Sequence, residues 1–411
     1  MTNEKHLYII PTNRDARDSV KSLVNDIKAV INNGLLKSNQ IYFVLLDSGN
    51  DIDFKLNHQQ FLKSIRQLTI NSYHIPVNRL DYLLENHLDM ELSQLLVGEG
   101  FSYGKMVNKI SIIANILNAQ YIHRRDSDVY IQETLDETTP LIAEVCAFKN
   151  DPKCMMVGSS YIGAWGIDYS DVEDDINTLR KLFSLSKPSY TDEQLDDYIN
   201  NKYIFGSKEH FDGNLIFSER KANYIDAGNF ALKDIFQYIP VSPADVTSGT
   251  DYLYNTVLGK SDWKMLYHND RVIHRYATDR YQRINHITYG DSKLLSRLMT
   301  KVTQTALDDV KLSSDFKKMN EQLSNSYYVS VHSSDIKTKL MITVDNFIEV
   351  YSTIPHDNYK KIASHISKNK KYYVDKTLND VSKFILLIDK WESVMKQTRN
   401  ISISKFAEVG D

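Results

Sequence analysis

The sequence contains few of the residues that interrupt regular structure or cross-link a small fold. Its 411 residues include 2 cysteines, 8 prolines and 15 glycines. Two cysteines cannot form a disulfide framework, and neither Cys146 nor Cys154 belongs to a paired motif that would indicate zinc. The shortage of proline and glycine predicts long, uninterrupted helices and strands.

The chain also lacks an excess of one charge and any long apolar run. Its 49 Lys and Arg residues face 53 Asp and Glu residues, for a formal net charge of -4. A nucleic-acid partner would need a clustered positive surface, so the composition argues against one. No apolar run approaches the roughly 20 residues of a membrane span, and the charged start lacks the core of a signal peptide. We expect a cytoplasmic protein without an integral membrane segment.

Three short apolar runs alternate with helical patterns in the first half of the chain. They are residues 7–10, 41–46 and 119–123, and polar residues follow each of them. This alternation predicts an α/β fold with a mostly parallel sheet flanked by helices. Ligands bind such sheets beyond the carboxyl ends of the strands. We therefore expect the polar residues that follow the three runs to meet at one edge.

Amphipathic spacing predicts several helices around and beyond this sheet. The predicted helices span residues 58–71, 78–96, 106–117, 294–312, 315–323 and 377–395. The character of the chain changes near residue 290, where helical patterns become continuous. We therefore expect a first domain over residues 1–290 and a mainly helical extension over residues 291–411.

An Asp-x-Asp motif, formed by Asp126, Ser127 and Asp128, follows the third run directly. Two carboxylates one residue apart can face one divalent cation, and Mg²⁺ and Mn²⁺ prefer such oxygen ligands. Alone, Asp-x-Asp is most often a surface turn. Its position at the end of a strand, on the edge where ligands bind, favours a metal site.

Four short motifs, in this order, resemble those of glycosyltransferases with the GT-A (Rossmann-like) fold, including family 2 members. They are IIPTNR at residues 9–14, VLLDSG at 44–49, FSYGKMVN at 101–108 and YIHRRDSD at 121–128. The resemblance covers roughly residues 7–290. It implies an enzyme that transfers a sugar from a nucleotide-diphosphate donor, with a UDP-sugar favoured.

The resemblance also implies where the donor and its cation bind. The implied donor-binding residues are Pro11, Thr12, Asn13, Arg14, Asp47, Gly104, Asn108, Arg125 and Asp126. Arg125 would additionally offset charge on the diphosphate during the reaction. A Mn²⁺ or Mg²⁺ ion would be held by Asp126, Asp128 and His274, with His268 as the alternative third ligand. His274 belongs to a segment that resembles the His-bearing strand of retaining glucosyl-phosphoglycerate and mannosylglycerate synthases.

A second block, DAGNFAL at residues 226–232, resembles the segment that lines the acceptor site in these enzymes. The implied acceptor-binding residues are Trp165, Asp168, Asn229 and Asp251. Asp251 would be the general base of an inverting reaction, although Thr250 stands where relatives carry an acidic residue. In a retaining reaction, which His274 favours, the donor phosphate would take the proton. The acceptor is left open as a small molecule, a peptide or a glycan.

Structural roles and other functions also stay open at this stage. Asp47 could end a strand, Asn108 could lie on a helix surface, and His274 or Trp165 could belong to the core. A nucleotidyltransferase would release pyrophosphate, but it usually carries a glycine-rich loop after the first strand. A non-catalytic interaction protein would not bind UDP with Mn²⁺. The C-terminal helices could shape an acceptor site, form a homodimer or cover the sheet.

Overall fold

The computed structural model of the protein describes most of the chain. The described residues are 4–49, 51–65, 70–98, 102–132, 138–164, 172, 174–187, 190–219, 225–226, 228–246, 252–275 and 285–407. Three predicted acceptor-site residues, Trp165, Asp168 and Asp251, lie outside the described residues.

The central sheet has eight strands in the order β3-β2-β1-β4-β9-β6-β10-β8. The strands are β1 (His6–Thr12), β2 (Ile41–Asp47), β3 (Asn71–Pro76), β4 (Tyr121–Arg125), β6 (Cys154–Gly158), β8 (Phe217–Glu219), β9 (Asn229–Lys233) and β10 (Lys264–His268). Strands β3, β2, β1 and β4 run parallel, as do β6 and β10. Only β9 and β8 run antiparallel to their neighbours. The mostly parallel sheet predicted from the sequence is confirmed.

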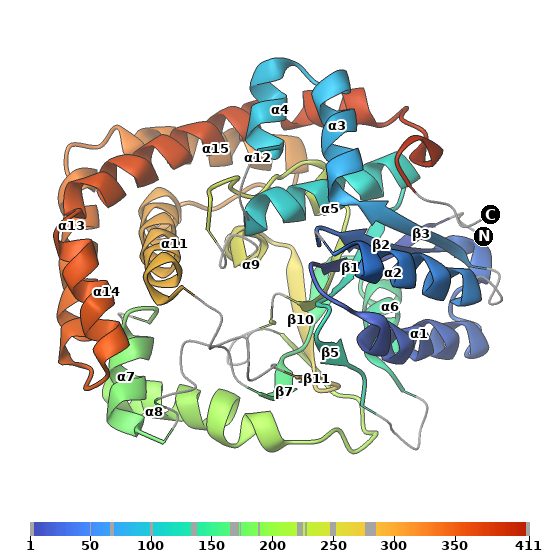
Figure 1. Ribbon diagram of the computed structural model, residues 1–411, viewed down its shortest axis with the longest axis horizontal. Helices are drawn as coiled ribbons and strands as arrows, with labels where there is room; N and C mark the ends of the chain where they lie inside the picture. Colours follow the sequence, from blue (N-terminus) through green and yellow to red (C-terminus); the bar gives the residue numbers. More distant parts are fainter. Residues whose placement is uncertain are drawn as a thin grey trace.

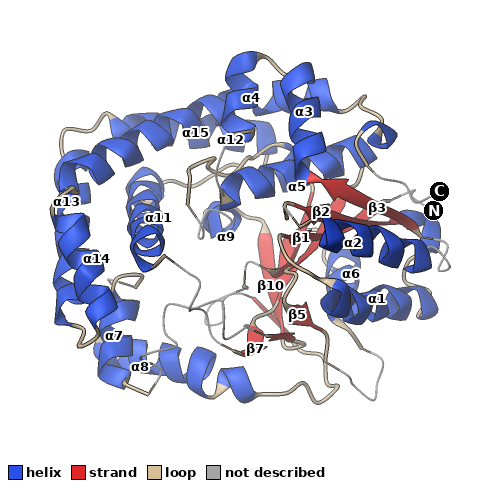
Figure 2. Cartoon of the chain, viewed as in Figure 1, coloured by secondary structure: helices blue, strands red, loops and turns tan. Residues whose placement is uncertain are grey.

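Helices cover both faces of this sheet (Figure 2). The helices before the C-terminal region are α1 (Arg17–Asn32), α2 (Ile52–Ile65), α3 (Val77–His87), α4 (Met90–Leu96), α5 (Tyr103–Leu117), α6 (Pro140–Asn150), α7 (Ile176–Ser184), α8 (Asp192–Ile199) and α9 (Tyr252–Gly259). Successive side chains of a strand point to opposite faces. In β1, Leu7 and Ile9 therefore join the core beneath α3, α4 and α5, whereas Tyr8 and Ile10 join the core beneath α1, α2 and α6.

The parallel strands place their carboxyl ends at one edge, as the sequence predicts. Thr12 at the end of β1 pairs with Asp47 at the end of β2, and Asp47 pairs with Pro76 of β3. On the other side of β1, β4 ends at Arg125 and is followed at once by Asp126. The polar residues that follow the three predicted strands are thus neighbours in space.

A smaller sheet of three strands, in the order β5-β11-β7, continues from this edge. Its strands are β5 (Val129–Tyr130), β7 (Tyr161–Gly163) and β11 (Val272–His274). His274 pairs with Val129, the residue after Asp128, and on its other side with Gly163. Gly163 has a φ of +92°, and a Cβ there would lie 2.7 Å from the His274 carbonyl oxygen, so the close approach requires glycine.

The C-terminal region is helical, as predicted, and packs on the face formed by α3, α4 and α5. Its helices are α11 (His286–Leu307), α12 (Phe316–Val331), α13 (Ile336–Thr353), α14 (Asp357–Ser367) and α15 (Lys370–Thr398). Figure 1 shows α13 and α14 on the opposite side of the molecule from α1 and α2. One buried cluster extends from β1 to α15, and α11 spans the predicted boundary at residue 290. Within the described residues, none of the helices combines the length and apolarity needed to cross a bilayer.

Trp391 attaches this region to the segment that follows β9. The indole is fully buried on α15, and its Nε1 donates a hydrogen bond of 3.0 Å to the Phe236 carbonyl. From α5, the Asn115 amide donates to the Met395 carbonyl at 2.7 Å. Helix α15 is therefore held by both apolar burial and specific hydrogen bonds.

We predict that Trp391→Ala lowers the free energy of unfolding by about 3–5 kcal/mol, because it leaves a large cavity in the shared core. The neighbouring exposed substitution Lys390→Ala is the control, with an expected change within about 0.5 kcal/mol. Urea denaturation followed by far-UV circular dichroism measures both. A loss below about 1 kcal/mol for Trp391→Ala would show that α15 contributes little to the core.

Candidate functional site

Asp128 lies where the loop after β1 meets the small sheet. Arg14 Nη1 is 2.8 Å from Asp128 Oδ2, and His274 Nε2 is 3.7 Å from Asp128 Oδ1. The backbone N–H of Arg275 donates to the Asp128 carbonyl at 2.9 Å, which fixes the start of β5 against β11. Only 11% of the Asp128 side chain and 10% of the His274 side chain are exposed. The structure thus brings three of the predicted site residues together, at a place that solvent still reaches.

The hydrogen bonding of His274 suits a role as a metal ligand. Its Nδ1 lies 3.1 Å from the Ala164 carbonyl oxygen, which can only accept, so we assign the ring proton to Nδ1. In the neutral ring, Nε2 then presents its lone pair toward Asp128. A histidine whose second nitrogen donates to a carbonyl is the usual arrangement around bound metals. Asp128 and His274 therefore fit the donor set of a divalent cation.

Asp126 is held differently from Asp128. Arg124 Nη2 lies 3.0 Å from its Oδ1, and the Tyr161 hydroxyl donates to its Oδ2 at 3.2 Å. The Tyr161 ring stacks on His274, with 4.8 Å between the centroids. A Cβ on Gly228 would collide with the Asp126 carboxylate and the Tyr161 hydroxyl, so a larger residue there would displace both groups.

The three predicted metal ligands are more widely spaced than a closed metal centre. The described residues contain one set of three histidine, cysteine or carboxylate side chains whose ligand atoms lie within 4.8 Å of one another. That set lies elsewhere in the fold. Because both oxygens of Asp126 also accept hydrogen bonds, its direct contact with a metal stays a prediction.

Arg125 ends β4 at the sheet edge, but its side chain points into the interior and not toward the expected diphosphate site. Its side chain is fully buried, with Nη1 2.9 Å from Glu144 Oε1 and Nη2 3.5 Å from Asp26 Oδ2. Burial raises the pKa of both carboxyl groups, and Arg125 opposes that shift. Side chains alternate along a strand, so it is Arg124 that contacts Asp126. Of the two adjacent arginines, Arg124 is therefore the one whose side chain lies next to the Asp-x-Asp motif.

Other predicted site residues also lie in the interior. Asn108 is buried on α5, where its amide donates to the Val241 carbonyl and accepts from the Val241 N–H, both at 2.9 Å. Asn229 is buried in β9 and donates to Ser159 Oγ. His268, the alternative metal ligand, is fully buried in β10 and does not contact Asp128. These contacts give Asn108 and Asn229 structural roles in this conformation.

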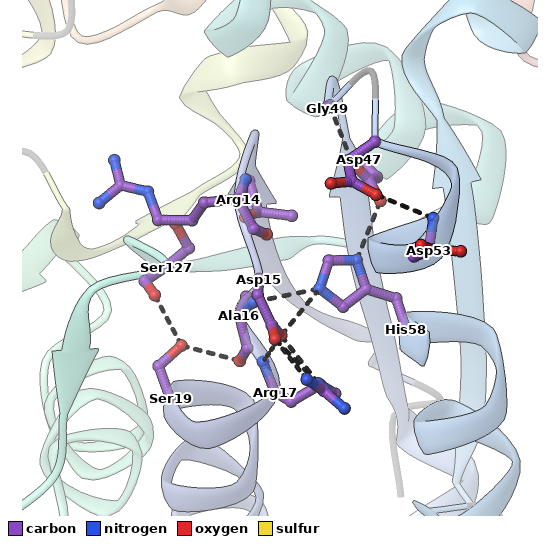
Figure 3. A network of polar contacts seen from close by, with 12 residues as sticks. Arg14, Asp15, Ala16, Arg17, Ser19, Asp47, Gly49, Asp53, His58 and Ser127 are labelled. Atoms are coloured by element: carbon purple, nitrogen blue, oxygen red, sulfur yellow. Dashed lines mark hydrogen bonds and ion pairs between the residues drawn. The ribbon is translucent and has the colours of Figure 1, made fainter. Parts of the chain in front are cut away.

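Asp47 is the acceptor in a buried network at the end of β2 (Figure 3). Its Oδ2 accepts from His58 Nδ1 and from His74 Nε2, each at 3.0 Å, and its Oδ1 accepts from the Gly49 N–H at 2.8 Å. On the other side of His58, Nε2 accepts from the Ala16 N–H at 3.1 Å. Burial alone would raise the pKa of Asp47, but these hydrogen bonds outweigh it and hold the pKa well below its usual range.

Asp47, His58 and His74 are the described set of three whose ligand atoms lie within 4.8 Å of one another, a spacing that a metal ion could bridge. A metal would need a deprotonated ring nitrogen facing Asp47. Because Ala16 donates to Nε2 of His58, the proton of the neutral ring lies on Nδ1, toward Asp47. The contacts therefore describe a carboxylate that accepts N–H donors from three sides, not a metal centre.

A cavity of about 490 Å³ lies beyond the ends of β1, β2 and β3. It is lined by Asn13, Asp47, Ser48, Gly49, Lys55, Val77, Asn78, Asp81, Gly98, Ser102, Lys105, Met106 and Lys109. Asn13 and Asp47 were predicted to bind the donor, while Pro11, Thr12 and the buried Gly104 do not line the cavity. Lys109 forms an ion pair with Asp81, and Lys105 Nζ lies 3.5 Å from Asp245 Oδ1. The cavity wall therefore carries both positively and negatively charged side chains.

Sequence reasoning missed several residues that shape this edge. His58 and His74 meet Asp47 from α2 and β3, and no local motif joins them. Tyr161 was not singled out, because one tyrosine among 26 gives no signal. Gly228 stood within the motif at residues 226–232, but its contact with Asp126 depends on the pairing of β4 with β9.

We predict that Asp47→Asn lowers the free energy of unfolding by about 1–3 kcal/mol at pH 7, because buried N–H donors lose their charged acceptor. Since the folded-state pKa of Asp47 is depressed, its carboxylate stabilises the protein above the unfolded value of about 3.9. That contribution is lost as the pH falls toward the folded-state value. Urea denaturation at pH 7 and pH 3 should show a smaller difference at pH 3. The exposed substitution Asp89→Asn is the control.

Three solved structures show a distant similarity to this chain. Mannosyltransferase PcManGT from Pyrobaculum calidifontis, in complex with GDP-Man and Mn²⁺, is 12% identical with a TM-score of 0.39, over 93% of this chain and 86% of that one. S. aureus TarS 1-349 in complex with UDP-GlcNAc is 10% identical with a TM-score of 0.39, over 95% and 92%. Mouse xyloside xylosyltransferase 1, in its apo form, is 11% identical with a TM-score of 0.25, over 56% and 66%.

No curated protein matches this chain in sequence. A family model does match, over residues 6–150 and 142–407, and its description reads "Family of unknown function (DUF6271)". These two matches extend from β1 to the end of the C-terminal helices. The chain therefore belongs to the DUF6271 family, whose function is unknown.

Proposed function

We propose that this protein is a metal-dependent glycosyltransferase that moves a sugar from a nucleotide-diphosphate donor, with a UDP-sugar favoured, to a small-molecule, peptide or glycan acceptor. One observation carries the proposal. At the carboxyl end of the sheet, Asp128 lies 2.8 Å from Arg14 Nη1 and 3.7 Å from His274 Nε2. The motif resemblance described above points to the same reaction.

The β1–α1 loop connects the two parts of the proposed donor site. Asn13 lines the 490 Å³ cavity, and the next residue, Arg14, contacts Asp128. We assign the nucleoside to the cavity and the diphosphate to the region around Asp128. Lys55, Lys105 and Lys109 line the cavity, and charge-assisted hydrogen bonds from such cations favour a phosphorylated ligand.

Each residue around Asp128 would have its own role in the proposed reaction. Asp128 and His274 would hold a Mn²⁺ or Mg²⁺ ion, which when bound supplies Lewis-acid stabilisation of the leaving diphosphate. Burial raises the pKa of Tyr161, so its hydroxyl remains a donor that orients Asp126. Arg124 adds a fixed positive charge beside Asp126. Asp251, which lies outside the described residues, stays the predicted general base. Retention of configuration also stays a prediction.

The proposal predicts Mn²⁺-dependent thermal stabilisation by a nucleotide-sugar, because a ligand that binds only the folded state raises its melting temperature. A panel of UDP- and GDP-sugars is screened with and without Mn²⁺. Asp128→Asn should abolish the Mn²⁺-dependent shift, and His274→Ala should weaken the apparent Mn²⁺ affinity. The exposed substitution Asp212→Asn should change neither.

Product analysis then separates the reaction classes. Release of UDP or GDP with transfer of the sugar supports the proposal, whereas release of pyrophosphate indicates a nucleotidyltransferase. A full Mn²⁺-dependent response in Asp128→Asn would remove the metal role assigned to this carboxylate.

Arg14 and a divalent cation would compete for Asp128 Oδ2, which lies 2.8 Å from the guanidinium. We therefore predict that Arg14→Ala tightens Mn²⁺ binding about two- to fivefold in the absence of nucleotide, as expected when a partly exposed ion pair is removed. Electron paramagnetic resonance of free Mn²⁺ measures the affinity. The control is Arg17→Ala, which removes the same charge from a pair with Asp15. Equal or weaker Mn²⁺ binding in Arg14→Ala would contradict this competition.

A further inference from the structure

A second cavity, of about 130 Å³, lies between α9 and the C-terminal helices α11, α12 and α15, and we call it the helix cavity. The twelve described residues that line it are all uncharged. Thr256, Thr300 and Thr303 contribute hydroxyl groups, whereas Tyr327 and Phe384 are fully buried aromatic residues. Unlike the 490 Å³ cavity, the helix cavity therefore has no charged side chain in its described lining.

The hydroxyl groups of the helix cavity are ordered by the helices that carry them. Thr300 Oγ1 donates to the Ser296 carbonyl at 2.9 Å, and Thr303 Oγ1 donates to the Met299 carbonyl at 3.0 Å. The Thr300 oxygen can still accept from a ligand hydroxyl, whereas Thr303 Oγ1 already lies 2.6 Å from the Tyr327 hydroxyl oxygen. A charged group buried here would find no oppositely charged partner among the described lining residues and would lose its hydration. The chemistry of the cavity thus suits a neutral, hydroxylated ligand.

One chain of contacts connects the helix cavity to the proposed donor site through α5. The carbonyl of Val246, a lining residue, accepts from the Tyr103 N–H at 3.0 Å. The Tyr103 hydroxyl accepts from the Arg124 guanidinium, which lies 3.0 Å from Asp126 Oδ1. Tyr103 and Arg124 therefore connect a residue of the cavity lining to the Asp-x-Asp motif.

We propose that the helix cavity binds an uncharged, hydroxylated part of the acceptor, a site that rests on the proposed glycosyltransferase function. Its volume is close to that of a protein cavity of about 150 Å³ that binds benzene, which suits a glycerol-sized or single-ring group. An acceptor hydroxyl oxygen bonds to the anomeric carbon of the donor sugar. The bond from that carbon to the diphosphate breaks with its electron pair, and the hydroxyl proton passes to a base or to the departing phosphate.

This assignment also gives the C-terminal region a role. Five of the lining residues, between Ser296 and Gln304, belong to α11, and Tyr327 and Phe384 come from α12 and α15. The sheet would supply the donor site, and the C-terminal helices would recognise the acceptor.

Saturation-transfer NMR on the full chain tests the site, with glycerol and methyl glucoside as neutral probes and glucuronate and glucosamine as charged ones. Spectra are recorded with and without UDP and Mn²⁺. We expect a neutral probe to bind, and Thr300→Trp, at an exposed position on the cavity rim, to weaken it at least tenfold. Thr300→Val, which removes only the hydroxyl, should weaken it less. Thr288→Trp, exposed on the same helix but outside the cavity, should bind like the unmodified chain.

Binding of neither neutral probe, equal binding by the charged sugars, or undiminished binding in Thr300→Trp would overturn the proposal. Melting temperatures of both tryptophan variants verify that they fold. If a neutral probe binds as expected while UDP with Mn²⁺ fails to bind, the glycosyltransferase function fails and the helix cavity remains a site for a neutral ligand.

Discussion

A fully buried guanidinium fixes the end of β4, and the candidate site depends on it. Arg125 is enclosed between α1 and α6, where Asp26 and Glu144 supply the opposite charge. Removing a cation from water costs several kcal/mol unless its partners remain in place, so strand, helices and side chains must assemble together. Because the Arg125 side chain points into the core, the Arg124 side chain faces α5, and the Asp-x-Asp motif begins directly after the strand. The buried ion pairs of Arg125 therefore fix the position of the acidic motif.

The general fold was accessible from the sequence because it depends on local periodicity. The three apolar runs became β1, β2 and β4, and the polar residues that follow them meet at one edge. Boundaries were less exact. The predicted helix at 78–96 is two helices, separated at Leu88 and Asp89, and helix α13 was not predicted. The amphipathic spacing does not reveal this break, because both helices bury their apolar side chains in the same core cluster.

The candidate site was only partly accessible, for a different reason. Adjacent arginines give the same pattern whichever one is buried, so the sequence could not separate Arg124 from Arg125. Which arginine is buried depends on two acidic residues, Asp26 on α1 and Glu144 on α6. Each lies more than fifteen residues from Arg125 along the chain. His58 and His74 likewise reach Asp47 only once α2 and β3 are in place. Pairings of this kind belong to the tertiary structure and leave no local motif.

Under the proposed function, the hydrogen bonds of Asp47 have a consequence for donor selectivity. Its two oxygens already accept three hydrogen bonds from the protein, which leaves about one acceptor position of the carboxylate for a nucleobase. Selectivity would then fall to side chains on the cavity wall such as Asn78, Asp81 and Lys109. Efforts to exchange one nucleotide-sugar for another would begin with these positions, and Asp47 would be retained as part of the scaffold.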